Sequence, residues 1–125
     1  MASTSGLQPH VKRGLRVLLD ALRGLGYSAT YTSGYRSTSK QAQLYAAWRA
    51  GKSPFPAAPP GTSEHNYGLA VDVVTDAPDA IKRLAADVAG LVWFGPTDAV
   101  HFGSYTPTEW RAIARSLAPR TPSKA

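Results

Sequence analysis

The segment from Ser63 to Asp72, SEHNYGLAVD, constrains the fold of this chain more than any other. His65 precedes Asp72 by seven residues, and that carboxylate interrupts an apolar run of the kind that forms a buried strand. An ionised carboxylate in such a strand costs several kcal/mol unless it is paired or bound to a metal ion. The intervening Tyr67-Gly68 pair allows a turn that brings the imidazole alongside the carboxylate. The fold must therefore supply Asp72 with a partner.

A second histidine, His101, lies in another short apolar stretch, three residues after Asp98. Two histidines and one carboxylate are a frequent catalytic zinc set, because three protein ligands leave the fourth position open for water. Taken alone, an aspartate in a strand more often lies at a bulge or an edge position, or pairs with a cation. Only the combination of the two histidines with the aspartate indicates a metal site. The remaining histidine, His10, stands beside Pro9 in the polar entry to a helix, and we expect it to be exposed and inert.

Three motifs in this order resemble a known family. They are SGYRS at 33–37, Ser-x-His-x-x-Gly-x-Ala-x-Asp at 63–72, and Asp-x-x-His at 98–101. Together they are similar to the zinc D-alanyl-D-alanine peptidases and L-alanyl-D-glutamate endolysins of the LAS group, which includes VanY-like enzymes. The resemblance runs from Ser33 to Phe102, more than half of the chain. It implies the LAS/Hedgehog-like zinc peptidase fold.

The resemblance also implies a role for each motif residue. One zinc ion per chain would be bound by His65, Asp72 and His101. Asp98 would be the catalytic carboxylate, Arg36 would polarise the scissile carbonyl, and Ser63 would contact substrate. One departure from the family pattern is the short segment at 93–97, where many endolysins carry a longer Trp-Gly-Gly loop. This shortening affects the expected shape of the substrate cleft more than the metal site.

The chemistry is consistent with these roles on independent grounds. Zinc with three protein ligands lowers the pKa of its bound water to about 7, and a carboxylate that does not bind the metal must then accept the proton. Asp98 follows the Gly95-Pro96 turn, so it can stand on a loop beside the site. Arg36 stays charged and presents a rigid donor fork for a developing oxyanion. Without the motif, a turn-favouring aspartate and a surface arginine would explain both residues.

Composition indicates one compact domain. A chain of 125 residues with 43% hydrophobic residues can fill a single core, and no run approaches the ~18 apolar residues of a membrane span. The absence of cysteine excludes disulfides and thiolate zinc sites. The first residues lack the basic and apolar regions of a secretory signal, so we expect synthesis in a cytoplasm and action on the bacterial cell wall. We also expect a monomer.

The net charge is +6 and the isoelectric point is near 9.9, which favours polyanionic partners. Nucleic acid is one such polymer, but the sequence contains no helix-turn-helix or RNP signature, and we predict no nucleic-acid partner. Bacterial walls, with teichoic acids and peptidoglycan carboxylates, are polyanionic too. A solvated basic surface without a partner is the alternative.

The order of elements predicts an α+β domain with a small, mostly antiparallel central sheet and flanking helices. The expected elements are helices at 11–25, from 38, at 80–88 and from 107, strands at 27–35, 69–74, 91–94 and 99–102, and an irregular loop at 52–61. Thr38 with Gln41, and Thr106 with Glu109, match the capping-box pattern. The domain is expected to cover residues 1–118, followed by a flexible tail at 119–125.

Helical spacing also predicts which side chains face the core. The expected apolar faces are Val11, Leu15, Leu18, Leu22 and Leu25 in the first helix, Tyr45 and Trp48 in the second, Ile81, Leu84, Ala85 and Val88 in the third, and Trp110, Ile113, Ala114 and Leu117 in the fourth.

The sequence thus predicts a zinc-dependent peptidoglycan peptidase, a phage endolysin cutting between L-alanine and D-glutamate. A D-alanyl-D-alanine carboxypeptidase or DD-endopeptidase with the same machinery is the nearest alternative. A more distant one is a non-catalytic zinc-binding module that recognises cell wall.

Overall fold

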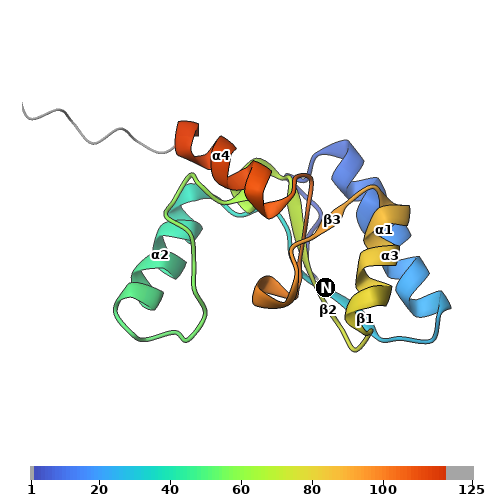
Figure 1. The fold of residues 1–125 in the computed structure, drawn as a ribbon. Helices are drawn as coiled ribbons and strands as arrows, with labels where there is room; N and C mark the ends of the chain where they lie inside the picture. The colour runs from blue at the N-terminus through green and yellow to red at the C-terminus, as the bar shows by residue number, and fades with distance from the viewer. Residues whose placement is uncertain (1, 118–125) are drawn as a thin grey trace, which may run out of the picture.

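The computed structural model describes residues 2–117 and has the α+β architecture expected from the sequence (Figure 1). Its elements are α1 (Pro9–Gly24), β1 (Ala29–Ser33), α2 (Thr38–Arg49), η1 (Glu64–Tyr67), β2 (Ala70–Thr75), α3 (Asp79–Ala89), β3 (Val92–Trp93), η2 (Pro96–Asp98), β4 (His101–Gly103) and α4 (Pro107–Leu117), where η denotes a 3-10 helix. Within the described residues, no helix combines the length and apolar character needed to cross a membrane.

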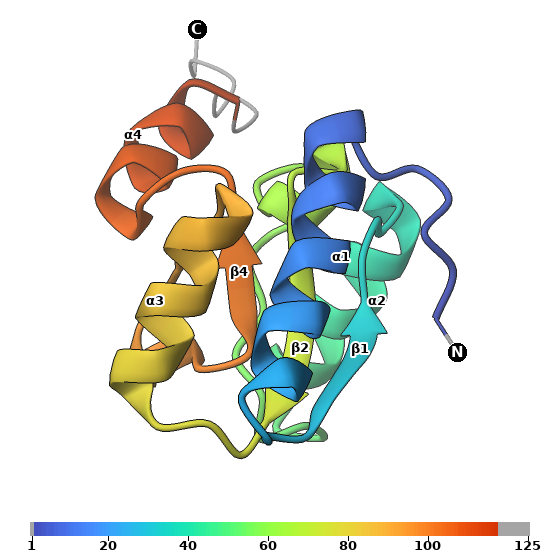
Figure 2. The same cartoon turned by 90° about the vertical axis from the view of Figure 1, so that its right-hand side faces the viewer.

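A four-stranded sheet with the order β1-β2-β4-β3 organises the molecule, and every neighbouring pair is antiparallel. Helices α1 and α3 lie side by side over one face of this sheet (Figure 2). On the other side, α2 and the segment that follows it extend away from the sheet, and α4 lies near one end (Figure 1). The predicted antiparallel sheet is therefore confirmed, and its two faces have different environments.

Alternation along the strands assigns apolar and polar side chains to opposite faces. Val71, Val73 and Phe102 are fully buried in the core against α1, as expected for a pleated strand with one covered face. Burial of each such side chain contributes about 1.5–3 kcal/mol. Asp72 lies between the two valines and points to the opposite face. The expectation that the whole run at 69–74 is buried was wrong, because Val74 on that opposite face is exposed.

Helix α1 buries the face that its spacing predicts, at Val11, Leu15, Leu18 and Leu22. The prediction failed only at its last member, Leu25, which is exposed. The helix ends at Gly24, Leu25 is its C-cap, and the chain turns at Gly26, where φ is +92°. Leu25 therefore lies past the last helical turn and does not reach the core.

Helix α3 is present as expected, and its predicted face is buried in part: Ala85 is in the core and Ile81 packs against it. Leu84 and Val88 are 55% and 63% exposed, whereas Ala85 and Ala86 are buried. Small residues face α1 because the two helices approach closely, and a Cβ at Gly14 of α1 would lie 2.9 Å from the Ala89 carbonyl oxygen. The predicted face is therefore confirmed at Ile81 and Ala85 and wrong at the larger side chains Leu84 and Val88.

Helix α2 differs from expectation at its start and along its apolar face. Ser37, not Thr38, is the N-cap, and its hydroxyl accepts a hydrogen bond from the Lys40 amide at 3.0 Å. Tyr45 and Trp48 are only partly buried and pack against each other, outside the main core. The helix stands apart from α1 and α3 in Figure 1, so these aromatic residues cannot reach that core.

Helix α4 begins at the predicted capping box. The Thr106 hydroxyl accepts from the Glu109 amide at 3.1 Å, and the Glu109 carboxylate accepts from the Thr106 amide at 2.8 Å. Trp110 is buried as expected, and its indole N–H donates to the Thr62 carbonyl at 2.9 Å. Leu117, predicted to face inward, is exposed. The predicted tail at 119–125 lies outside the described residues, and the domain division remains a prediction.

Candidate active site

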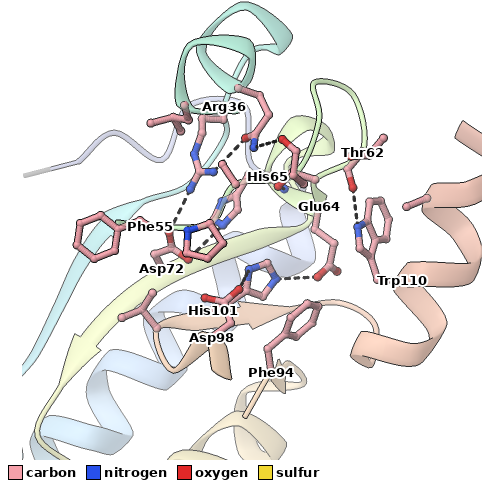
Figure 3. Close-up of a pocket in the computed structure, with 18 of the residues that line it drawn as sticks. Arg36, Phe55, Thr62, Glu64, His65, Asp72, Phe94, Asp98, His101 and Trp110 are labelled. Atoms are coloured by element: carbon pink, nitrogen blue, oxygen red, sulfur yellow. Dashed lines mark hydrogen bonds and ion pairs between the residues drawn. The ribbon is translucent and has the colours of Figure 1, made fainter. Parts of the chain in front are cut away.

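Strand pairing brings two of the three expected metal ligands together. Asp72 of β2 and His101 of β4 are register partners on neighbouring strands, and both point away from the core. His65 comes from η1, which immediately precedes β2. The ligand atoms of His65, Asp72 and His101 all lie within 4.8 Å of one another (Figure 3). The structure thus gathers the residues that the sequence nominated as a metal site.

His65 is oriented by contacts on both sides of its ring. Its amide donates to the hydroxyl of Ser63, the N-cap of η1, at 3.2 Å. Its Nδ1 lies 2.7 Å from the Gly34 carbonyl oxygen, which can only accept, so Nδ1 carries the ring proton. The lone pair of Nε2 is then free, and this atom lies 3.1 Å from Asp72 Oδ1.

His101 is oriented by Glu64, a residue that the sequence analysis did not single out. Glu64 Oε1 lies 2.8 Å from His101 Nε2, and the Glu64 side chain is 0% exposed. The other oxygen accepts from the amides of Ser104 and Tyr105 at 2.9 and 3.3 Å. Glu64 therefore keeps the proton on Nε2 and leaves Nδ1 of His101 facing the cleft. A Cβ at Gly103 would collide with this carboxylate, so the glycine provides its space.

The donor atoms fit a zinc ion. His65 Nε2, His101 Nδ1 and Asp72 Oδ1 supply two neutral imidazole nitrogens and one carboxylate oxygen, a combination that zinc binds in catalytic sites. Each histidine also has its other nitrogen held by an acceptor, which is the usual surrounding of a metal-binding imidazole. Three protein donors leave one coordination position for water.

Arg36 follows β1 and lies beside Asp72. Its Nη2 donates to Asp72 Oδ2 at 3.1 Å (Figure 3). The same atom donates to the Ser33 hydroxyl at 3.2 Å. Burial alone would raise the pKa of Asp72. Contact with the His65 imidazole, with His101 and the Arg36 guanidinium nearby, outweighs burial and holds that pKa below its usual value. Asp72 is therefore ionised at neutral pH, as a metal ligand must be.

Asp98 stands at the end of η2, beside the ligand cluster and not within it. Its Oδ2 lies 3.6 Å from His101 Nδ1, and its side chain is 53% exposed to the cleft. Partial burial, with the negative charge of Asp72, raises the pKa of Asp98, against the opposing effect of His101, His65 and Arg36. A carboxylate with a raised pKa is a better proton acceptor. The loop position predicted from the Gly95-Pro96 turn is thus the position observed.

Residues 4–105 match the sequence model of a family described as VanY, D-alanyl-D-alanine carboxypeptidase. The chain belongs to the VanY family. A relative in Bacillus subtilis, the peptidoglycan L-alanyl-D-glutamate endopeptidase CwlK, is 36% identical over 80 residues. That match covers 63% of this chain and 48% of CwlK, so the chain spans about half the length of this relative.

Solved structures share the fold. DacB from Streptococcus pneumoniae is 27% identical with a TM-score of 0.60, and the match covers 91% of this chain and 76% of DacB. The vancomycin-resistance D,D-pentapeptidase VanY, solved as a variant in complex with Zn(II), has a TM-score of 0.60 at 24% identity. That match covers 87% of this chain and 78% of VanY. The predicted fold and family resemblance are both confirmed.

Two further residues near the VanY-family motifs were not predicted to belong to the site. Gln41 is buried, its Oε1 accepts from Arg36 Nη1 at 3.0 Å, and its Nε2 donates to the Ala58 carbonyl at 2.9 Å. It therefore links Arg36 to the loop after α2. Phe94 stacks on the His101 ring with 3.8 Å between ring centroids. Gln41 lies one turn into α2 and Phe94 directly follows β3. The sequence assigned Gln41 to a capping pattern and Phe94 to a strand, so neither was given a role in the site.

Ser63 and His10 both make contacts that the sequence did not predict. The Ser63 hydroxyl caps η1, and the residue is buried at the edge of the cleft, so its predicted contact with substrate remains a prediction. His10 is exposed as expected, but its Nε2 lies 2.9 Å from the Ser104 hydroxyl. It thus joins the start of α1 to the segment after β4, and it is more than an isolated surface side chain.

The ligand cluster forms the floor of a cleft of about 1030 Å³. On one side the wall is the loop after α2, where Phe55 is 76% exposed and lines the same cleft as Arg36 and Asp72 (Figure 3). Helix α4 forms the opposite side, with Trp110 at its base. The loop at 52–61 was predicted to be irregular and is so, because four prolines interrupt it. A cleft of this size, open at its surface, can admit an extended peptide.

Proposed function

We propose that the protein is a zinc-dependent peptidase that hydrolyses the stem peptide of bacterial peptidoglycan, at the bond between L-alanine and D-glutamate. One arrangement carries this proposal: three zinc donors, a separate carboxylate and an arginine converge on the floor of one open cleft. Binding alone would need only the three donors. The addition of Asp98 and Arg36 supports hydrolysis over a non-catalytic wall-binding module.

The proposed reaction divides the work among these residues. His65, Asp72 and His101 would hold a zinc ion, which when bound would supply an activated water near neutral pH and polarise the scissile carbonyl. Asp98 accepts a proton from the attacking water and returns it to the leaving amine, which its raised pKa and partial exposure favour. Arg36 donates to the developing oxyanion. Its pairing with Asp72 and Gln41 holds the guanidinium in place for this task.

The choice of bond rests on similarity and on cleft shape. CwlK, by its name, acts on L-alanyl-D-glutamate bonds and is 36% identical over the matched region. The cleft continues past the ligand cluster on both sides, toward Phe55 and toward α4, so an internal bond can lie across the site. A net charge of +6 favours approach to the polyanionic wall. A role as a phage lytic enzyme is part of the same proposal.

The second candidate is a D-alanyl-D-alanine carboxypeptidase, which the description of the matching family favours. Such an enzyme removes the terminal residue and must hold its free carboxylate near the scissile bond. The zinc donors and Asp98 would serve both reactions, so the two candidates differ only in which part of the peptide occupies the cleft.

Digestion of purified sacculi distinguishes the two candidates. We expect new amino termini on D-glutamate, identified by mass spectrometry of the products, with release of free D-alanine at background. Free D-alanine without new glutamate termini would establish the carboxypeptidase instead. Chelation should stop either reaction and added zinc should restore it. If the zinc-loaded protein bound sacculi but released nothing, the non-catalytic module would be correct.

A further inference from the structure

The two walls of the cleft differ in chemistry. The wall at the end of α2 and the loop after it is mainly apolar, with cleft-lining residues Leu44, Phe55, Pro56, Ala57 and Ala58. The wall formed by α4 carries two positive charges, Arg111 and Arg115, which line the same cleft. A peptide lying across the catalytic floor would therefore meet an apolar surface at one end and a cationic surface at the other.

The two arginines are well placed to act together. They are four residues apart on α4, so they occupy the same face of the helix one turn apart. The helix is held at this end of the cleft by the Trp110 indole, which donates to the Thr62 carbonyl at 2.9 Å. Trp110 also packs against the rings of Tyr67 and Tyr105. The helix therefore presents Arg111 and Arg115 from a fixed base.

Neither arginine has an acidic partner among the residues that the structure describes. Arg111 donates only to the Thr108 hydroxyl at 3.3 Å, within its own helix, and both side chains are exposed. The acidic groups of the cleft lie at its floor: Asp72 pairs with Arg36, and Glu64 with His101. Asp98 lies 3.6 Å from His101. Two uncompensated guanidinium groups beside a binding cleft suit a carboxylate ligand, which they can bind through paired N–H donors.

We propose that Arg111 and Arg115 form a carboxylate-binding subsite that selects stem peptides with a free carboxylate at the α4 end of the cleft. This inference rests on the proposed peptidoglycan peptidase function and adds the group that the enzyme recognises. A stem peptide carries carboxylates on D-glutamate, on a diaminopimelate residue and on its terminal D-alanine. Amidation of any one of them removes its charge, so the subsite would distinguish amidated from free peptides.

The test uses zinc-loaded protein and the N-acetylated tetrapeptide L-alanyl-γ-D-glutamyl-diaminopimelyl-D-alanine, with free carboxylates or with one of the three amidated. In the double variant Arg111→Gln/Arg115→Gln we expect KM for the free peptide to rise about tenfold, with kcat nearly unchanged. Amidation at the recognised carboxylate should raise KM of the wild type by a similar factor and abolish the difference between wild type and variant. The amidated position that does so identifies the group.

Two control variants define the effect. Arg111→Lys/Arg115→Lys keeps the charge but loses the paired N–H donors, so it should recover only part of the affinity. Arg16→Gln removes an exposed arginine of α1, on the opposite side of the sheet, and should leave KM unchanged. An equal KM for wild type and the double glutamine variant on every peptide would overturn the inference and leave the proposed function intact.

A failure of the proposed function would look different. If the wild type cleaved none of the peptides, calorimetric binding of the same peptides would still decide the subsite. Tighter binding of the free tetrapeptide by the wild type than by the double glutamine variant would support the subsite. Equal affinities would overturn it.

Discussion

The two faces of the central sheet are built from the same strands but are stabilised in different ways. On the face under α1 and α3, Val71, Val73 and Phe102 are held by non-directional apolar packing. On the cleft face, Asp72 and His101 alternate with them, and their polar atoms have named partners at defined distances. In the residues described, no buried side-chain nitrogen or oxygen lacks a hydrogen-bond partner.

This contrast indicates how each face should respond to mutation. The core face tolerates changes in proportion to the volume lost, because its contacts are many and individually small. The cleft face depends on single donors and acceptors, so one substitution can remove a function without unfolding the protein. Variants on the two faces should therefore separate stability from zinc binding and turnover.

The largest effect is expected from loss of a zinc donor. His101→Ala should abolish stoichiometric zinc binding and all hydrolysis, because only two donors would remain. Elemental analysis of the purified variant measures this directly. His10→Ala is the matched control, a histidine outside the cluster, and it should retain one zinc ion per chain. Full zinc occupancy in His101→Ala would show that the ligand assignment is incorrect.

A smaller loss is expected at the groups that act on the substrate. Asp98→Asn should retain zinc but lose about 100-fold or more in kcat, because the amide cannot accept the proton. Arg36→Ala should lose a comparable factor through loss of oxyanion stabilisation. Zinc content and steady-state rates are measured on the same samples. If Asp98→Asn lost its zinc, Asp98 would be a ligand and the role of Asp72 would need revision.

A still smaller effect, on zinc affinity, is expected from Glu64, which acts through His101. Glu64→Gln should weaken zinc affinity by about 10–100-fold, as for other partners of metal-binding histidines. Gly103→Ala should act in the same direction, because its Cβ would displace the Glu64 carboxylate. Competition with a chromogenic chelator measures the affinity, and Glu109→Gln in the α4 cap is the control. Unchanged affinity in both variants would leave Glu64 with a purely structural role.

The smallest effect on the site is expected from the core face. Leu18→Ala should lower the free energy of unfolding by about 2–5 kcal/mol, because Leu18 is fully buried. Denaturant unfolding of the zinc-free protein measures this loss. Zinc stoichiometry of the folded fraction should remain that of the wild type. A loss of zinc binding in folded Leu18→Ala protein would mean that the two faces are coupled more tightly than their packing suggests.

The elements that were predicted correctly are those whose signals are local. The start of α4 was recognised because Thr106 and Glu109 bond to each other within one turn. The buried face of α1 followed from its 3.6-residue period. Two members of the predicted α3 face, Leu84 and Val88, are exposed because burial there depends on close approach to Gly14 of another helix. Leu25 is exposed because it is the C-cap of α1, just before the turn at Gly26.

The sequence by itself determined the chemistry of the site: which side chains can bind zinc, which carboxylate stands outside the set, and which arginine accompanies them. Only the tertiary structure decided how they are oriented. The partners that orient His65, Arg36 and His101 are 31, 36 and 37 residues away in the sequence. Local patterns carry no information on such contacts. They arise from strand register and from the buried carboxylate of Glu64, which are properties of the packed fold.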